Sequence, residues 1–429
     1  MVVRARGARS MVGVSALLAG MVLAVAPVRA EGLPAGCAGA VTAGNDTITC
    51  SDNLTAGSVL DAGDGDDTIV IEGDVLEGAA VSGGVGKDKI SARNVGRFLC
   101  PAAELGADDV NGGVLDGGPG DDEITVGGQD RPAACDAAMQ KGLGGNVGRH
   151  GAVVGGPGND VLRIGSVGYV FQPDAAKPET TAGAHGGRVS GDDGDDTITI
   201  DTVSLGERPP SGTAPDAPDA VFGGAGKDTI SVHRTVGAAD IYGDAYAPIP
   251  DAAGDTITVD EMTGGWVHGG PGDDLLTGGT LGGAGAALWG DDGNDTIKAA
   301  DMYLGASVFG GDGNDALSAT SLNKDPSTRA ATLIGGNGDD KIDIGTVGTT
   351  DAVVLGDGTD PTAGADPNSG TGKDTITAIA NNGSIFGGND DDTITIDVNN
   401  NLVDGSAGTN TCTIKGQGSR GSVIACDQK

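Results

Sequence analysis

Small aliphatic residues recur at fixed positions around a short polar turn along almost the whole chain. One stands two positions before each turn, and Ile or Leu stands two positions after the aspartate that closes the turn. This alternation predicts pairs of short strands that each point a side chain into a common core. The residues that follow the turns are Ile48, Ile69, Ile90, Ile124, Leu162, Ile198, Ile230, Ile257, Leu276, Ile297, Leu317, Ile342, Ile376 and Ile394.

The turn itself is a repeated motif, Gly-Gly-x-Gly-x-Asp. The strict copies begin at Gly83, Gly117, Gly155, Gly223, Gly269, Gly310 and Gly335 and end at Asp88, Asp122, Asp160, Asp228, Asp274, Asp315 and Asp340. Near matches end at Asp67, Asp196, Asp295 and Asp392, and shortened or interrupted copies end at Asp46, Asp255 and Asp374. A motif repeated this often indicates a solenoid in which each copy contributes one coil.

The spacing between successive motif aspartates defines one coil. The shortest spacing is 18 residues, which suits two short strands joined by a Gly-Asp turn on one side and a looser turn on the other. We therefore expect an all-β fold, a parallel β-roll or β-helix solenoid of about 14 coils with one Gly- and Asp-rich turn per coil. Longer spacings predict loop insertions on the loose side at about 96–114, 127–152, 171–188 and 206–220. Two further insertions, 245–253 and 359–371, interrupt the Gly-Asp turn itself.

Composition supports this prediction and excludes other classes of protein. The 429 residues include 81 Gly but only 11 aromatic residues, too few for the thick core of a globular protein of this length. Of the 61 acidic residues 53 are Asp, which favours turns and metal coordination over helices. The formal net charge of −36 disfavours a nucleic-acid partner, because phosphate binding requires clustered Lys and Arg.

The repeat resembles the RTX, or haemolysin-type, calcium-binding repeat, Gly-Gly-x-Gly-x-Asp-x-U-x with an aliphatic residue at U. Residues 221–230, VFGGAGKDTI, are representative, and the resemblance covers roughly residues 41–397. It implies a parallel β-roll in which the turns of adjacent coils share Ca²⁺. The chain differs from the family in carrying the motif on only one half-turn per coil, so we expect a single row of ions. It also differs in having its export signal at the N-terminus.

Oxygen ligands for calcium are available at every turn. Ca²⁺ takes about six to eight oxygen atoms; glycine lets the turn aim its carbonyl groups, and the closing Asp adds a carboxylate. Adjacent coils lie about 4.8 Å apart, so unneutralised aspartates would repel one another and folding should require calcium. The candidate ligands are Asp67, Asp88, Asp122, Asp160, Asp196, Asp228, Asp274, Asp295, Asp315, Asp340, Asp392, Gly83, Gly117, Gly155, Gly223, Gly269, Gly310 and Gly335. The alternative is a metal-free β-helix in which these residues only form turns.

Two subsets of the turns carry more specific expectations. Turns that match the motif strictly in adjacent coils should give the strongest sites, and the interrupted turns at Asp255 and Asp374 should give weaker ones. Lys87, Lys227 and Lys373 stand just before a motif Asp, and we expect them to face solvent and reduce the repulsion between the aspartates.

The first 30 residues predict an export signal. Arg4, Arg6 and Arg9 precede an apolar run at 12–26, which is short for a membrane span, and small residues stand before a cleavage position after Ala30. We therefore expect a secreted, extracellular protein with no membrane span after cleavage.

Six cysteines remain after cleavage, an even number that suggests disulfides in an exported chain. Sequence-local pairing, one of 15 connectivities, would join Cys37 to Cys50, Cys100 to Cys135 and Cys412 to Cys426. A zinc site is disfavoured, because no Cys-x-x-Cys spacing occurs. Residues 31–50 would then form an N-terminal cap and the first coil, 51–398 the solenoid, and 399–429, which lack the motif, a disulfide-linked cap containing a small hairpin.

The chain carries no HExxH, Gly-x-Ser-x-Gly or Walker motif, and we expect a structural or adhesive binding protein, not an enzyme. The alternative is a β-helical polysaccharide lyase or epimerase with a site in the loop insertions.

A second column of residues stands immediately before the first Gly of the motif. Its later members are Phe222, Tyr242, His268, Trp289, Phe309, Ile334, Leu355 and Phe386. Alternation places them on the outer face, opposite the inward aliphatic residues. They would form either a stacking ladder that stiffens the sheet or an exposed apolar stripe that binds a partner, such as an extracellular glycan or a cell-surface component.

Overall fold

The computed structural model describes residues 33–427 except for residues 77, 97–112, 128–146, 149–150, 169–186, 206–219, 238, 245–251, 284, 324–329 and 359–369. Every regular element in the described ranges is a β-strand. The predicted export signal, the pairing of Cys100 with Cys135 and most of the four loose-side loops lie outside the described residues. No helix in the described part of the chain is long and apolar enough to cross a membrane.

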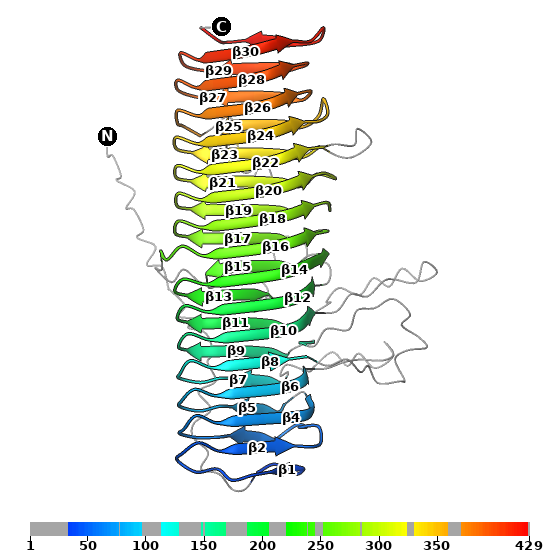
Figure 1. The fold of residues 1–429 in the computed structure, drawn as a ribbon, viewed down its shortest axis with the longest axis vertical. Helices are drawn as coiled ribbons and strands as arrows, with labels where there is room; N and C mark the ends of the chain where they lie inside the picture. Colours follow the sequence, from blue (N-terminus) through cyan, green and yellow to red (C-terminus); the bar gives the residue numbers. More distant parts are fainter. Residues whose placement is uncertain are drawn as a thin grey trace, which may run out of the picture. The chain divides into compact units, whose positions relative to one another are not determined.

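The strands form two long sheets and alternate between them along the chain (Figure 1). Sheet A contains β1 (Cys37–Ala38), β2 (Thr47–Cys50), β4 (Thr68–Val75), β6 (Lys89–Val95), β8 (Glu123–Val126), β10 (Val161–Gly168), β12 (Thr197–Leu205), β14 (Thr229–Gly237), β16 (Thr256–Met262), β18 (Leu275–Leu281), β20 (Thr296–Met302), β22 (Ala316–Leu322), β24 (Lys341–Val347), β26 (Thr375–Asn381), β28 (Thr393–Asn399) and β30 (Thr411–Gln417). Sheet B contains β3 (Val59–Asp61), β5 (Ala80–Ser82), β7 (Val114–Asp116), β9 (Ala152–Pro157), β11 (Arg188–Asp193), β13 (Val221–Ala225), β15 (Asp240–Asp244), β17 (Trp266–Pro271), β19 (Ala287–Asp292), β21 (Ser307–Asp312), β23 (Thr332–Asn337), β25 (Val353–Asp357), β27 (Ser384–Gly388), β29 (Leu402–Ser406) and β31 (Ser422–Ile424).

Each coil consists of one strand from each sheet, joined by the Gly-Asp turn. Strand β21 leads through such a turn into β22, and the chain then returns through the looser turn to β23 in the next coil. Neighbouring strands in a sheet therefore come from successive coils, and they pair in parallel, as β20, β22 and β24 do. The exception is β1, which pairs antiparallel with β2 at the first edge of sheet A. The predicted parallel β-solenoid is confirmed.

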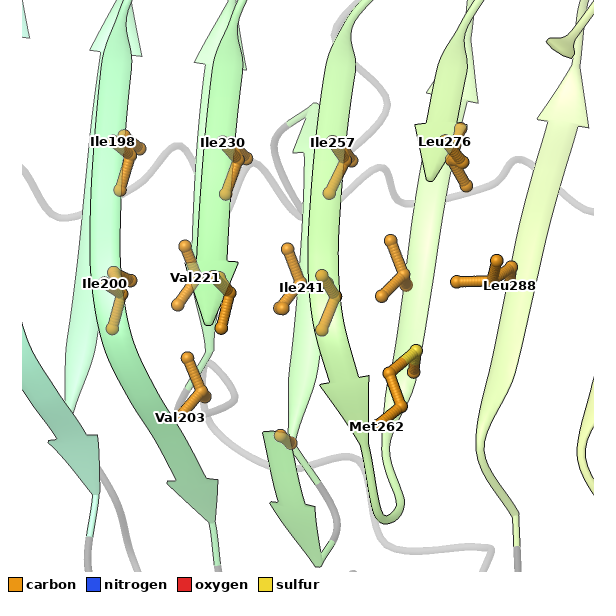
Figure 2. Packing of buried hydrophobic residues seen from close by; sticks show 14 of the residues in the cluster. Ile198, Ile200, Val203, Val221, Ile230, Ile241, Ile257, Met262, Leu276 and Leu288 are labelled. Carbon is orange, nitrogen blue, oxygen red and sulfur yellow. The ribbon is translucent and has the colours of Figure 1, made fainter. Parts of the chain in front are cut away.

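The core is a narrow space between the sheets, filled by columns of aliphatic side chains (Figure 2). Ile230, Ile257 and Leu276 occupy equivalent positions in β14, β16 and β18, and Val221 and Ile241 from sheet B belong to the same core. All of the aliphatic residues predicted to follow the turns are at most 1% exposed. Because one coil contributes few such side chains, each coil depends on its neighbours to cover them.

The column before the first Gly packs as a continuous stack on the other face of sheet B. Ring centroids are 5.1 Å apart between Tyr242 and His268, 5.7 Å between His268 and Trp289, and 4.0 Å between Trp289 and Phe309. Phe222 and Phe309 are only 3% and 5% exposed. The stacking-ladder interpretation is confirmed, and the hypothesis of an exposed stripe is wrong for these two buried residues.

Both ends of the described solenoid carry the predicted disulfides. Cys37–Cys50 ties β1 to β2, and Cys412–Cys426 ties β30 to the segment after β31. The predicted hairpin near the C-terminus is wrong. Strands β30 and β31 instead extend sheets A and B in parallel with β28 and β29, because the chain makes one more coil before it ends.

We expect the core columns to carry much of the stability. Replacing Ile257 (1% exposed) by Ala should lower the free energy of unfolding by about 2–5 kcal/mol, whereas replacing Ile379 (63% exposed) by Ala should change it by about 0.5 kcal/mol or less. Chemical denaturation of both variants measures the difference. Equal losses would contradict this account of the core.

Candidate cation sites between the coils

Each Gly-Asp turn buries the carboxylate of its closing aspartate. In the turn between β21 and β22, Gly311 and Gly313 adopt φ values of 125° and 143°, in a region that L-residues with side chains rarely enter. The chain can therefore bend sharply enough to bring Asp315 to the start of β22, where it is 2% exposed. Burial of so many unpaired carboxylates is rare in proteins and requires a compensating interaction.

One carboxylate oxygen of each motif aspartate is bonded to the coil before it. The backbone N–H of Asp295 donates to Oδ1 of Asp315 at 2.8 Å, and the N–H of Asp315 donates to Oδ1 of Asp340 at 2.8 Å. The same bond recurs through Asp67, Asp88, Asp122, Asp160, Asp196, Asp228, Asp255, Asp274, Asp295, Asp315, Asp340, Asp374 and Asp392, which we call the aspartate ladder. The structure thus brings together all of the aspartates predicted as ligands.

For most of these aspartates the other carboxylate oxygen is buried and, among the described residues, accepts no hydrogen bond. This holds for Oδ2 of Asp67, Asp88, Asp122, Asp160, Asp196, Asp255, Asp274, Asp295, Asp315, Asp340, Asp374 and Asp392. A buried ionised oxygen without a donor is costly. Each such atom therefore needs a proton, a cation or another donor that the described residues do not supply.

A backbone carbonyl oxygen converges on this second carboxylate oxygen. A Cβ atom built on Gly310 would lie 2.3 Å from Oδ2 of Asp315 and 2.3 Å from the carbonyl oxygen of Gly335 in the next coil. The same pair of oxygens, one carboxylate and one carbonyl, surrounds each glycine predicted as a ligand: Gly83, Gly117, Gly155, Gly223, Gly269, Gly310 and Gly335. Two acceptors close to one glycine are the kind of oxygens that a cation between successive coils can bind.

The interrupted turns have the same arrangement. A Cβ on Gly243 would lie 2.2 Å from Oδ2 of Asp255, and one on Gly356 would lie 2.1 Å from Oδ2 of Asp374. The ladder passes through both aspartates without a break. In the described parts of these two turns, the carboxylate oxygen lies as close to the glycine as it does in the strict turns, which were expected to give stronger sites.

Burial makes the ladder carboxyl groups weak acids in the absence of a cation. Loss of hydration, followed by the charges of neighbouring aspartates, raises the pKa of Asp196 to about 8 and that of Asp340 to about 9. The backbone N–H bond at Oδ1 opposes this effect but is the smaller contribution. Asp315 has a smaller rise, to about 6. The folded chain without metal therefore favours protons on these oxygens.

A second, exposed row of side chains runs beside the ladder, one position earlier in each turn. The N–H of Asn294 donates to Asp273 at 2.8 Å, and the N–H of Asn314 donates to Asn294 at 2.9 Å. Where this row contains lysine, Lys87 pairs with Asp121, and Lys373 pairs with Asp391. Both lysines are more than half exposed, which confirms the expectation that they face solvent and neutralise nearby acids.

The last buried rung of the ladder among the described residues was not predicted from the sequence. Asn410 accepts the N–H of Asp392 through its amide oxygen at 2.8 Å, as a motif aspartate would. Its turn is a degenerate copy of the motif, residues 405–410, and it lies 18 residues after Asp392, the minimum coil length. Allowing Asn in place of Asp at that spacing would have revealed it.

The donor set decides which cation fits. Within the described ranges no group of three or more His, Cys, Asp or Glu side chains surrounds a possible metal position. A cation in the ladder would therefore take most of its ligands from backbone carbonyls, with a carboxylate from the closing aspartate. Oxygen-only ligands in a flexible number suit Ca²⁺, whereas Zn²⁺ prefers nitrogen and sulfur and Mg²⁺ retains its water.

Comparisons with known proteins do not assign the chain to a family. No family model and no curated protein matches it. A similar solved structure is that of a hyperactive, Ca²⁺-dependent, β-helical antifreeze protein from an Antarctic bacterium, which is 16% identical. The match covers 90% of this chain and 80% of that one, with a TM-score of 0.37. So low a score and identity leave the chemistry of the sites to be judged from their own geometry.

The raised pKa values predict an unusual dependence of stability on pH. Because the folded-state pKa of a ladder aspartate lies above its ordinary value of 3.8, the metal-free fold is fully favoured below about pH 4 and loses stability as pH rises through about 6 to 9. Thermal unfolding of metal-free protein across this range should show a falling midpoint. A flat or rising midpoint would contradict burial of these carboxylates; exposed aspartates would act only near pH 4.

The crowding beside the first Gly predicts that it cannot be replaced. In Gly310→Ala the new methyl group would meet two oxygens at 2.3 Å, so the turn must open, at a cost of about 1–3 kcal/mol or more. The matched control is Gly44→Ala, where a Cβ meets nothing within 4 Å. Thermal unfolding should separate the two variants; equal midpoints would show that the carboxylate and carbonyl oxygens do not converge as described.

Proposed function

We propose that this chain is a secreted calcium-binding protein of the RTX type, in which Ca²⁺ is held between adjacent coils and drives folding. The observation that supports this proposal best is the buried Oδ2 atom that lies, from Asp88 to Asp392, beside the same glycine as a carbonyl oxygen of the next coil. A cation there satisfies both acceptors at once.

The ligands of one such ion can be named. Oδ2 of Asp315 and the carbonyl oxygen of Gly335 converge beside Gly310, so the ion takes ligands from two successive coils. Oδ1 of Asp315 is held by the N–H of Asp295 in the preceding coil. The ion neutralises the carboxylate of Asp315, and Oδ1 of that carboxylate connects the ion to a third coil.

Calcium dependence of folding follows from this arrangement. Without a cation, carboxyl groups that are either ionised or protonated lie buried in neighbouring coils. The thin aliphatic core must then offset the free-energy cost of burying them. An ion that binds the folded chain and not the unfolded one stabilises the fold by mass action. The stability of the solenoid should therefore rise with the concentration of free calcium.

The location of the protein fits such sites. An export signal is predicted at residues 1–30, and two disulfides tie the ends of the described solenoid. Calcium outside cells is abundant enough for modules with dissociation constants of about 10⁻⁴–10⁻³ M. We propose a structural or adhesive role in which calcium stiffens the coils.

We propose binding without catalysis. The alternative, a polysaccharide lyase or epimerase, was predicted to use the loose-side insertions, which lie largely outside the described residues. No feature of the described residues favours that activity over the cation sites.

Calcium should stabilise the β-structure of the mature chain. Near the unfolding temperature of the metal-free protein, far-ultraviolet circular dichroism titrated with Ca²⁺ should show a cooperative gain of β signal, and Mg²⁺ at the same concentration should give little, because it retains its water. Native mass spectrometry counts the bound ions and should find several. An unchanged spectrum in chelator, with no bound calcium at millimolar supply, would contradict the proposal.

The matched variants are Asp315→Ala and Asp397→Ala. Asp315 lies in the ladder, whereas Asp397 is 46% exposed and pairs with Lys415. Each substitution removes one negative charge, but only Asp315→Ala removes a ladder carboxylate. Asp315→Ala should bind about one ion fewer and require more calcium to fold, and Asp397→Ala should behave like the unmodified protein.

A further inference from the structure

The last buried rung of the ladder is an asparagine. Asn410 is fully buried, and its amide oxygen accepts the N–H of Asp392 at 2.8 Å, the role that Oδ1 has in the aspartates. The remaining question is what the amide nitrogen does in the place of the second carboxylate oxygen.

The amide nitrogen of Asn410 donates to carbonyl oxygens of its own turn and of the next coil. The donor–acceptor distances are 2.7 Å to Gly405, 3.2 Å to Ala407 and 3.3 Å to Ala425. One side-chain nitrogen thus lies among three backbone acceptors. A carboxylate oxygen at the same point would face those acceptors without any hydrogen to offer.

The position is the same one that Oδ2 occupies in the preceding coil. A Cβ on Gly387 would lie 2.3 Å from Oδ2 of Asp392 and 2.7 Å from the carbonyl oxygen of Gly405. A Cβ on Gly405 would lie 2.8 Å from the amide nitrogen of Asn410 and 2.2 Å from the carbonyl oxygen of Ala425. The final coil therefore places a hydrogen-bond donor where the others place an acceptor.

The first motif aspartate also finds donors within the protein. The N–H and the hydroxyl of Thr42 both donate to the carboxylate of Asp46, with the hydroxyl at 3.0 Å from Oδ1. Beyond Asn410, the next carboxylate is that of the exposed Asp427, which accepts the N–H of Asn410 at 3.1 Å. Buried carboxylate oxygens without donors thus lie between these ends.

We propose that Asn410 terminates the row of cation sites, and that an amide at a ladder position replaces the ion with its own N–H groups. This inference rests on the proposed calcium binding of the aspartate rungs. The amide nitrogen of Asn410 already donates to the carbonyl oxygens of Gly405 and Ala425, which lie where the other rungs would offer ligands to an ion. Whether the ladder position of a coil holds Asp or Asn then decides whether that coil requires calcium for its stability.

The test compares Asp315→Asn with Asp397→Asn and adds Asn410→Asp. Asp315→Asn places an amide in an interior rung, where its nitrogen faces the carbonyl oxygen of Gly335 and its oxygen can keep the N–H of Asp295. Asp397→Asn removes the same charge from an exposed position. Bound calcium is counted by native mass spectrometry, and the unfolding temperature is measured in metal-free buffer at pH 8.

We expect Asp315→Asn to bind one ion fewer and, without metal, to unfold several degrees above both the unmodified protein and Asp397→Asn. Asn410→Asp should unfold several degrees lower without metal and lose no ion. The inference is overturned if Asp315→Asn is no more stable than Asp397→Asn without metal, or if Asn410→Asp keeps its metal-free stability. Failure of the calcium proposal would look different: the unmodified protein would bind no ion, while the metal-free comparison would still report on the amide.

Discussion

A buried carboxylate oxygen that faces a backbone carbonyl oxygen is the contact on which the solenoid depends. It recurs beside the first Gly of one turn after another, and neither atom can supply a hydrogen. A proton or a cation shared by the two oxygens would compensate for their burial. The composition follows from this constraint: glycine leaves room for the two oxygens, aspartate is short enough to reach back from the turn, and the large negative charge is the sum of many such sites.

The thin core explains why these contacts matter so much. Each coil adds a few aliphatic side chains to the space between the sheets. Each coil contacts mainly the coil before it and the coil after it. Stability in such a structure is approximately a sum of coil and interface contributions. An interaction at every interface, repeated along the whole stack, therefore decides whether the chain is folded. The stacked aromatic column on sheet B adds a second repeated contact over part of the length.

The solenoid, the length of its coils and the column of aspartates could all be predicted from the sequence. All three repeat with the same motif. Ile257 and Asp315 lie where their spacing placed them. Prediction from the sequence failed where an insertion or a substitution interrupts the repeat. The interrupted turn at Asp374 keeps its carboxylate oxygen beside Gly356, although an insertion separates the two residues in the sequence. The C-terminal segment was assigned a hairpin because a short disulfide loop suggests one, although its strands extend both sheets. Asn410 was not predicted because the motif that defines the ladder ends in aspartate. The burial of Phe309 was not predicted because it depends on side chains in neighbouring coils, which the alternation of residues along one strand does not describe.

The most direct test of the calcium ladder is an anomalous diffraction map from crystals of the mature protein grown with calcium. The account predicts a single row of peaks, one for each interval between turns along the aspartate ladder, each between a motif carboxylate and the glycine carbonyl of the next coil, with no peak beside Asn410. A map without such peaks, in which each carboxyl oxygen lies at hydrogen-bond distance from its carbonyl partner, would show that protons hold the ladder together and would contradict the account.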